Sequence, residues 1–113
     1  MSEILKQKGC TCFNLDKVKL LIELKAERDF SVMSKAFKAV GHEKRLTVLY
    51  LISKESLCVC DLANTMESPV STMSQYLRIL KEAGLIYDEQ QHKFLIYKLT
   101  ELGKKVIGKF IYE

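Results

Sequence analysis

The sequence lacks the features that mark several common protein classes. No apolar run approaches the ~18 residues that a membrane span needs, and the start, MSEILKQKGCTCF, has neither the apolar core nor the cleavage site of a signal peptide. It also has no glycine-rich phosphate loop and no nucleophile–base arrangement. We therefore expect a cytoplasmic protein without a membrane partner, and not an enzyme.

Histidine and proline are scarce, whereas cysteine is not. The two histidines, His42 and His92, are interpreted as a helix-start side chain and a solvated loop residue rather than as metal ligands. The four cysteines form two Cys-X-Cys pairs, Cys10 with Cys12 and Cys58 with Cys60. In a reducing cytosol such cysteines favour metal or redox chemistry over structural disulfides.

Length and composition indicate one globular domain with a modest core. The chain has 113 residues, of which 48% are hydrophobic. At this length the buried fraction of the surface is limited, so a core shared within a dimer would add stability. The net charge of +4 permits nucleic-acid binding without requiring it.

Hydrophobic spacing predicts a mainly α-helical chain with one small β-hairpin. Residues 1–15 are expected to form a flexible arm that carries Cys10 and Cys12, and residues 16–113 a single domain. The expected order is helices over 16–27, over 31–40 and from His42 to about residue 53, a two-helix motif over 56–85, a hairpin over about 85–99, and a last helix over about 100–112.

The two-helix motif has the pattern of a helix-turn-helix. Ser56 is expected to cap its first helix. Ser68 is expected to cap the second, at about 69–83, with Pro69 in the first helical position and Gly84 just past the end. Val70 is expected to face inward with the other apolar residues of this second helix. With the hairpin as a wing, the fold is predicted to be a winged helix-turn-helix.

The second helix of the motif has the composition of a DNA-reading helix. Small polar side chains allow a helix to lie deep in the major groove, where glutamine can pair with adenine. The expected DNA-binding residues on this helix and on the wing are Ser71, Thr72, Ser74, Gln75, Tyr76, Arg78, Lys81, His92 and Lys93.

Three segments carry a resemblance to the ArsR/SmtB family of metal-sensing transcriptional repressors. They are FKAVGHEKRL at 37–46, LCVCDL at 57–62, and STMSQYL at 71–77 followed by EAGL at 82–85. With the cysteine-bearing arm, the chain looks most like the cadmium- and lead-responsive (CadC-like) branch. The resemblance implies a homodimer that binds double-stranded operator DNA without metal and releases it when a metal ion binds.

The resemblance also implies a ligand set. Cys10, Cys12, Cys58 and Cys60 would hold a soft ion, Cd²⁺ or Pb²⁺ first, with Zn²⁺, Bi³⁺ or As(III) also open. The family's second zinc site on the last helix is expected to be absent, because Gly103 stands where a histidine would be. Arsenic-binding relatives often have a third cysteine where this chain has Ala63.

The spacing of Cys58 and Cys60 sets a geometric expectation. Two residues apart on a regular helix, the thiols would point ~200° apart. One ion could then bind both only if the helix start unwinds, which would carry strain directly into the helix-turn-helix.

Other readings of the cysteines stay open. They could be small core hydrophobes, so that the chain is a constitutive DNA-binding module. They could also form the switch of an As(III)-responsive repressor, or of a thiol redox or persulfide sensor, in which a disulfide between the arm and the Cys58–Cys60 pair changes DNA binding.

Overall fold

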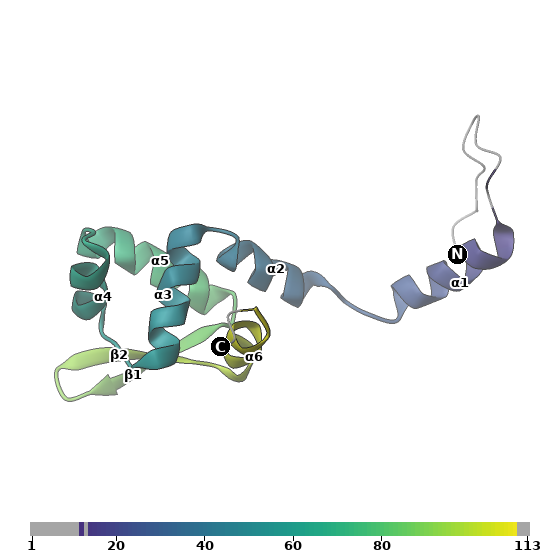
Figure 1. Ribbon diagram of the computed structural model, residues 1–113. Helices are drawn as coiled ribbons and strands as arrows, with labels where there is room; N and C mark the ends of the chain where they lie inside the picture. The colour runs from purple at the N-terminus through teal and green to yellow at the C-terminus, as the bar shows by residue number, and fades with distance from the viewer. Residues whose placement is uncertain (1–11, 13, 111–113) are drawn as a thin grey trace. The chain divides into compact units, whose positions relative to one another are not determined.

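A computed structural model describes residue 12 and residues 14–110 (Figure 1). For Phe110 it describes the backbone alone. The chain divides into two compact units. The units are residues 1–30 and 31–113. In the described part of the chain, no helix combines the length and the apolar character that crossing a membrane demands.

The first unit contains α1 (Leu15–Ala26). The Asn14 side chain accepts a hydrogen bond from the Lys17 backbone N–H at 3.0 Å, which caps the helix start. None of its residues is buried, and Leu15, Leu20, Leu21 and Leu24 are all exposed. Taken by itself, this helix therefore presents an uncovered apolar face.

The second unit is a winged helix-turn-helix, as predicted. In chain order it contains α2 (Ser31–Val40), α3 (Glu43–Lys54), α4 (Val59–Met66), α5 (Val70–Glu82), β1 (Ile86–Gln91), β2 (Phe94–Leu99) and α6 (Glu101–Phe110). The strands pair antiparallel as a two-stranded sheet.

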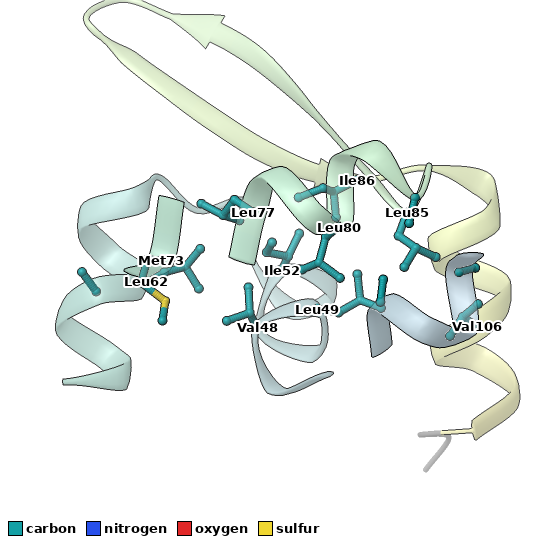
Figure 2. Close-up of a cluster of buried hydrophobic side chains, with 14 residues drawn as sticks. Val48, Leu49, Ile52, Leu62, Met73, Leu77, Leu80, Leu85, Ile86 and Val106 are labelled. Atoms are coloured by element: carbon teal, nitrogen blue, oxygen red, sulfur yellow. The ribbon is translucent and has the colours of Figure 1, made fainter. Parts of the chain in front are cut away.

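The core of the second unit lies among α3, α4, α5 and α6 (Figure 2). The largest fully buried side chains are Val48, Leu49, Leu62, Met73, Leu77, Leu80, Leu85 and Ile86. Those on α5 recur at three- and four-residue spacing, so one stripe of this helix is buried while the opposite stripe stays exposed. The core thereby fixes which side of α5 faces outward.

Both helices of the motif begin later than the sequence predicted. Helix α4 begins at Val59 with Cys58, not Ser56, as its N-cap, because Leu57 pairs with Tyr97 of β2 and holds the chain extended up to that point. The Leu57 carbonyl accepts a hydrogen bond from the Tyr97 N–H at 2.8 Å. Helix α5 begins at Val70 with Pro69, not Ser68, as its N-cap.

Two further expectations about α5 have opposite outcomes. Val70 was expected to be buried but is 48% exposed, because it starts the helix beside the turn and not over the core. Gly84 does follow the helix end, with φ of 80° that glycine adopts without steric cost.

The wing occupies the predicted hairpin region and has a tight turn. The polar residues 88–91 belong to β1, with Gln91 opposite Phe94. Only His92 and Lys93 connect the strands, and His92 has φ of 55°, as two-residue hairpin turns require.

Helix α6 packs closely on the end of the motif. A Cβ atom on Gly103 would overlap the Leu85 carbonyl oxygen. The Thr100 hydroxyl donates to the Gly84 carbonyl at 2.6 Å and accepts from the Gly103 N–H at 3.1 Å. A residue with a side chain at position 103 would therefore push α6 away from the wing base.

Candidate functional site

The exposed stripe of α5 carries the polar residues expected to read DNA. Ser71, Ser74, Gln75 and Arg78 are all exposed and spaced along one helix face. Because Met73, Leu77 and Leu80 anchor the opposite face in the core, this polar stripe is held outward on a rigid support. Such a surface suits the major groove of DNA.

Thr72 and Tyr76 lie on the flank of α5 and are half-buried. The Tyr76 ring lies 5.2 Å from the His42 ring and 6.0 Å from the Arg45 guanidinium carbon. Arg45 is itself fixed by a 2.7 Å hydrogen bond from Nε to the Ala39 carbonyl. Tyr76 is thus turned toward the start of α3, and packing accounts for its position.

The two cations expected on this helix already have partners. Arg78 lies 3.6 Å from Glu82 in an exposed pair. The Lys81 ammonium donates to the Asp88 carboxylate at 2.7 Å, and this contact raises the pKa of Lys81. Lys81 therefore links the recognition helix to β1 of the wing, a role that the sequence did not indicate.

The wing turn presents the remaining expected DNA-binding residues. His92 and Lys93 are exposed, and the His92 carbonyl accepts a 3.1 Å hydrogen bond from the Gln90 side chain. Further down the hairpin, Lys98 pairs with Glu89 at 2.6 Å. This contact lowers the pKa of Glu89 and raises that of Lys98.

Cys58 and Cys60 lie at the start of α4, the helix that precedes the recognition helix. Cys58 has an extended backbone, with φ −91° and ψ 169°, while Cys60 is in the first helical turn. The expected 200° separation assumed that both residues follow the helical repeat, whereas only Cys60 does. Both thiols are free, Cys60 exposed and Cys58 half-buried, so no unwinding is needed to reach them.

Asp61 completes the start of α4 and was missed at the sequence level. Its carboxylate accepts a hydrogen bond from the Cys58 N–H at 3.4 Å, while the Cys58 thiol faces the Asp61 N–H in the reciprocal arrangement of a capping box. The signal was present in the sequence, since Asp61 follows Cys58 by three residues, but the helix start had been placed too early.

The expected metal ligands come from both units of the chain. Cys12 is exposed and belongs to the first unit, whereas Cys58 and Cys60 belong to the second. Cys10 lies outside the described residues. Within residues 12 and 14–110, no three histidine, cysteine, aspartate or glutamate side chains gather closely enough to hold a metal ion.

Another feature missed at the sequence level is an apolar groove between α2 and α6. Its volume is about 270 Å³, and its lining is Met33, Phe37, Leu102, Lys105, Val106 and Lys109. Phe37 is 47% exposed. The apolar residues of α2 are divided, with Ala36 and Ala39 buried and Val32, Met33 and Phe37 exposed.

The exposed polar helix, the anchored wing and the buried motif core together define a winged helix-turn-helix DNA-binding protein. Residues 42–88, which run from the start of α3 into the wing, match the family model of bacterial regulatory proteins of the arsR family. A regulator from Staphylococcus aureus, the cadmium resistance transcriptional regulatory protein CadC homolog, is 35% identical over 92 residues, which cover 80% of this chain and 76% of the relative. The chain belongs to the ArsR family and is a transcriptional regulator, not an enzyme.

Further relatives agree with this assignment. The arsenical resistance operon repressor of Escherichia coli is 37% identical over 65 residues, 57% of this chain and 56% of the relative. Among solved structures, a homodimeric winged helix-turn-helix DNA-binding domain from Mycobacterium bovis superposes with a TM-score of 0.64 at 19% identity, covering 90% of this chain and 86% of that one. At this identity the likeness supports the fold.

Proposed function

We propose that this regulator represses transcription by binding operator DNA as a homodimer, and that it releases the DNA when a soft metal ion binds its thiolates. Cys58 and Cys60 supply two ligands, and Cys10 and Cys12 supply the others. Cd²⁺ and Pb²⁺ are the favoured ions, with Zn²⁺, Bi³⁺ and As(III) as further candidates. The reading residues are those exposed on α5, together with His92 and Lys93 on the wing.

One observation carries this proposal: an accessible thiol, Cys58, caps the helix that packs against the recognition helix. Thiolates are the ligands that soft metals prefer. The relatives named for cadmium resistance support the choice of metal. Ala63, where a third thiol would serve arsenic, is buried in the core.

The capping box provides a route from the thiol to the recognition helix. The Cys58 sulfur and the Asp61 carboxylate both help to fix the first turn of α4. When a metal ion binds the Cys58 sulfur, the sulfur no longer accepts from the Asp61 N–H. The backbone of the first turn of α4 must then change its conformation. Since α4 and α5 share one core, that adjustment reaches the reading surface.

The apolar groove between α2 and α6 supports the homodimer. Val32, Met33 and Phe37 are exposed along α2, beside Leu102 and Val106 of α6. An exposed apolar patch of this kind, rimmed by Lys105 and Lys109, is typical of a protein–protein interface. A second copy placed across it would pair the two patches by two-fold symmetry and present two recognition helices to successive half-sites.

Metal titration under strict reduction tests the proposal. Adding Cd²⁺ to the full-length protein should produce an ultraviolet thiolate-to-metal charge-transfer band that saturates at one ion per protomer. Because the thiols must lose protons to bind, affinity should weaken as the pH falls below the ordinary thiol pKa of ~8.5. Cys58→Ser and Cys60→Ser should each reduce the band, and Ser56→Ala serves as the matched control.

The same experiment separates the competing thiol mechanism. A redox or persulfide sensor would show no stoichiometric charge-transfer band under reduction. It would instead lose DNA on oxidation, with a disulfide between the arm and the Cys58–Cys60 pair detectable by mass spectrometry.

A further inference from the structure

The far end of the wing presents apolar side chains to solvent. Phe94 is 59% exposed and Leu95 41% exposed, next to the turn formed by His92 and Lys93. The hairpin extends away from the helices that hold the core (Figure 2). These groups contribute nothing to the core and are available for a contact outside the monomer.

Charge on the wing is largely neutralised within the protein. Lys98 pairs with Glu89, and Asp88 pairs with Lys81 of the recognition helix. Within the described residues, Lys93 at the turn is the wing lysine that has no acidic partner. A wing built this way has little electrostatic attraction for phosphates, which makes its apolar tip the larger contact surface.

The wing is also held in a defined relation to the reading helix. The 2.7 Å contact between Lys81 and Asp88 joins α5 to β1, and Leu57 joins the start of α4 to β2. With α5 in a major groove, a hairpin projecting beside it meets the neighbouring groove, which in B-DNA is the minor groove. Proteins that bind this groove frequently use phenylalanine or leucine there.

We propose that Phe94 is an apolar minor-groove contact of the wing, and that it adds affinity for operator DNA without adding salt dependence. Its ring would pack against the sugars and base edges that line the groove. Lys93 beside it would supply the single phosphate contact of the tip. The inference rests on DNA binding by this family and not on the metal response.

Fluorescence anisotropy without metal tests this inference, with a duplex enriched from a random library by the full-length protein. Phe94→Ala should weaken binding about tenfold or more, as expected for losing burial of one phenylalanine. The slope of log affinity against log salt should stay unchanged. Lys93→Ala should instead reduce that slope by about one. Hydroxyl-radical cleavage, which attacks sugars from the minor groove, should lose one protected patch per half-site with Phe94→Ala.

Phe94→Leu keeps an apolar side chain and should retain most of the affinity, while Tyr87→Ala removes an exposed aromatic ring from the other end of the hairpin and should change little. Binding by Phe94→Ala within twofold of the wild type at every salt concentration would overturn the inference. Equal losses from Phe94→Ala and Phe94→Leu, or unchanged protection of the sugars, would overturn it as well. Failure of the wild type to enrich any duplex would count against DNA binding itself.

Discussion

Single residues of two kinds carry the proposed activity: thiols at the start of α4 and small polar side chains along α5. The thiols lie at a helix end, whereas the polar side chains lie on the exposed face of a helix. Gln75 is exposed on a helix whose other face is fixed in the core, which suits recognition of a rigid partner. Cys58 caps a short helix of eight residues, so a change at its sulfur affects a large share of that element.

Gln75→Ala should cost about 1–3 kcal/mol against the preferred operator, because a bidentate contact with one base is lost. Competition between the preferred duplex and variants at single positions measures the effect. Lys81→Ala is the comparison and should weaken all sequences alike. Unchanged operator preference in Gln75→Ala would remove this residue from the reading set.

Residue patterns predicted the burial of Met73, Leu77 and Leu80, because helical spacing alone determines which face is apolar. They did not predict the Lys81–Asp88 contact, which depends on how the hairpin folds back beside α5. Nor did they predict the packing of Tyr76 near His42. Both arise from tertiary placement, which local spacing does not encode.

At the scale of elements, the start of α4 is the most informative. Its position depends on the pairing of Leu57 with Tyr97, a contact between segments far apart in sequence, and so the helix start could not be read from capping residues alone. The length of β1 likewise depends on pairing between strands. Its residues 88–91 are polar, yet the ladder opposite Phe94 to Tyr97 makes them strand.

Asp61→Asn should destabilise the protein by about 0.5–2 kcal/mol, because the acceptor of the Cys58 N–H changes and the negative charge at the helix start is lost. Urea unfolding followed by circular dichroism measures it. Asp16→Asn, in the first turn of α1, is a matched control outside the winged unit. Equal stability of Asp61→Asn and the wild type would show that the negative charge at the helix start contributes nothing.

The wing should loosen at acid pH. Lys98 lowers the pKa of Glu89 below its ordinary 4.5, so the pair stabilises the folded wing above that value, and this contribution is lost as the pH falls through the folded pKa. Amide chemical shifts of residues 89 and 98 should follow this change, and added salt should reduce it. In Glu89→Gln the acid-induced change in these chemical shifts should vanish. If the change persists in this variant, another group causes it.

At the scale of the whole molecule, the proposed dimer decides whether two recognition helices can act together. By spacing alone, residues 16–27 and the last helix are amphipathic and are candidates for its interface. The structure adds α2, whose exposed Phe37 and Met33 line one groove with α6. Sequence could not reveal this groove, since the same spacing is typical of a helix buried within a monomer.

Phe37→Asp should shift the protein toward a monomer and greatly weaken operator binding, because one half-site has too few contacts. Analytical ultracentrifugation at micromolar concentration measures the shift. Leu20→Asp makes the same change on α1 and determines whether that helix also contributes. If Phe37→Asp sediments as the wild type does and both are dimers, the α2–α6 face is not the interface.

Operator release by cadmium tests the central claim most directly, with anisotropy of a labelled operator duplex followed under strict reduction as Cd²⁺ is added. The wild-type complex should lose affinity by about 5–150-fold, the range typical of coupling between two sites. Operator DNA should in turn weaken Cd²⁺ binding by the same factor. Cys60→Ser should bind the operator as tightly as the wild type and keep it when cadmium is added. A Cys60→Ser protein that still leaves the operator at the same cadmium concentration would contradict the proposed mechanism.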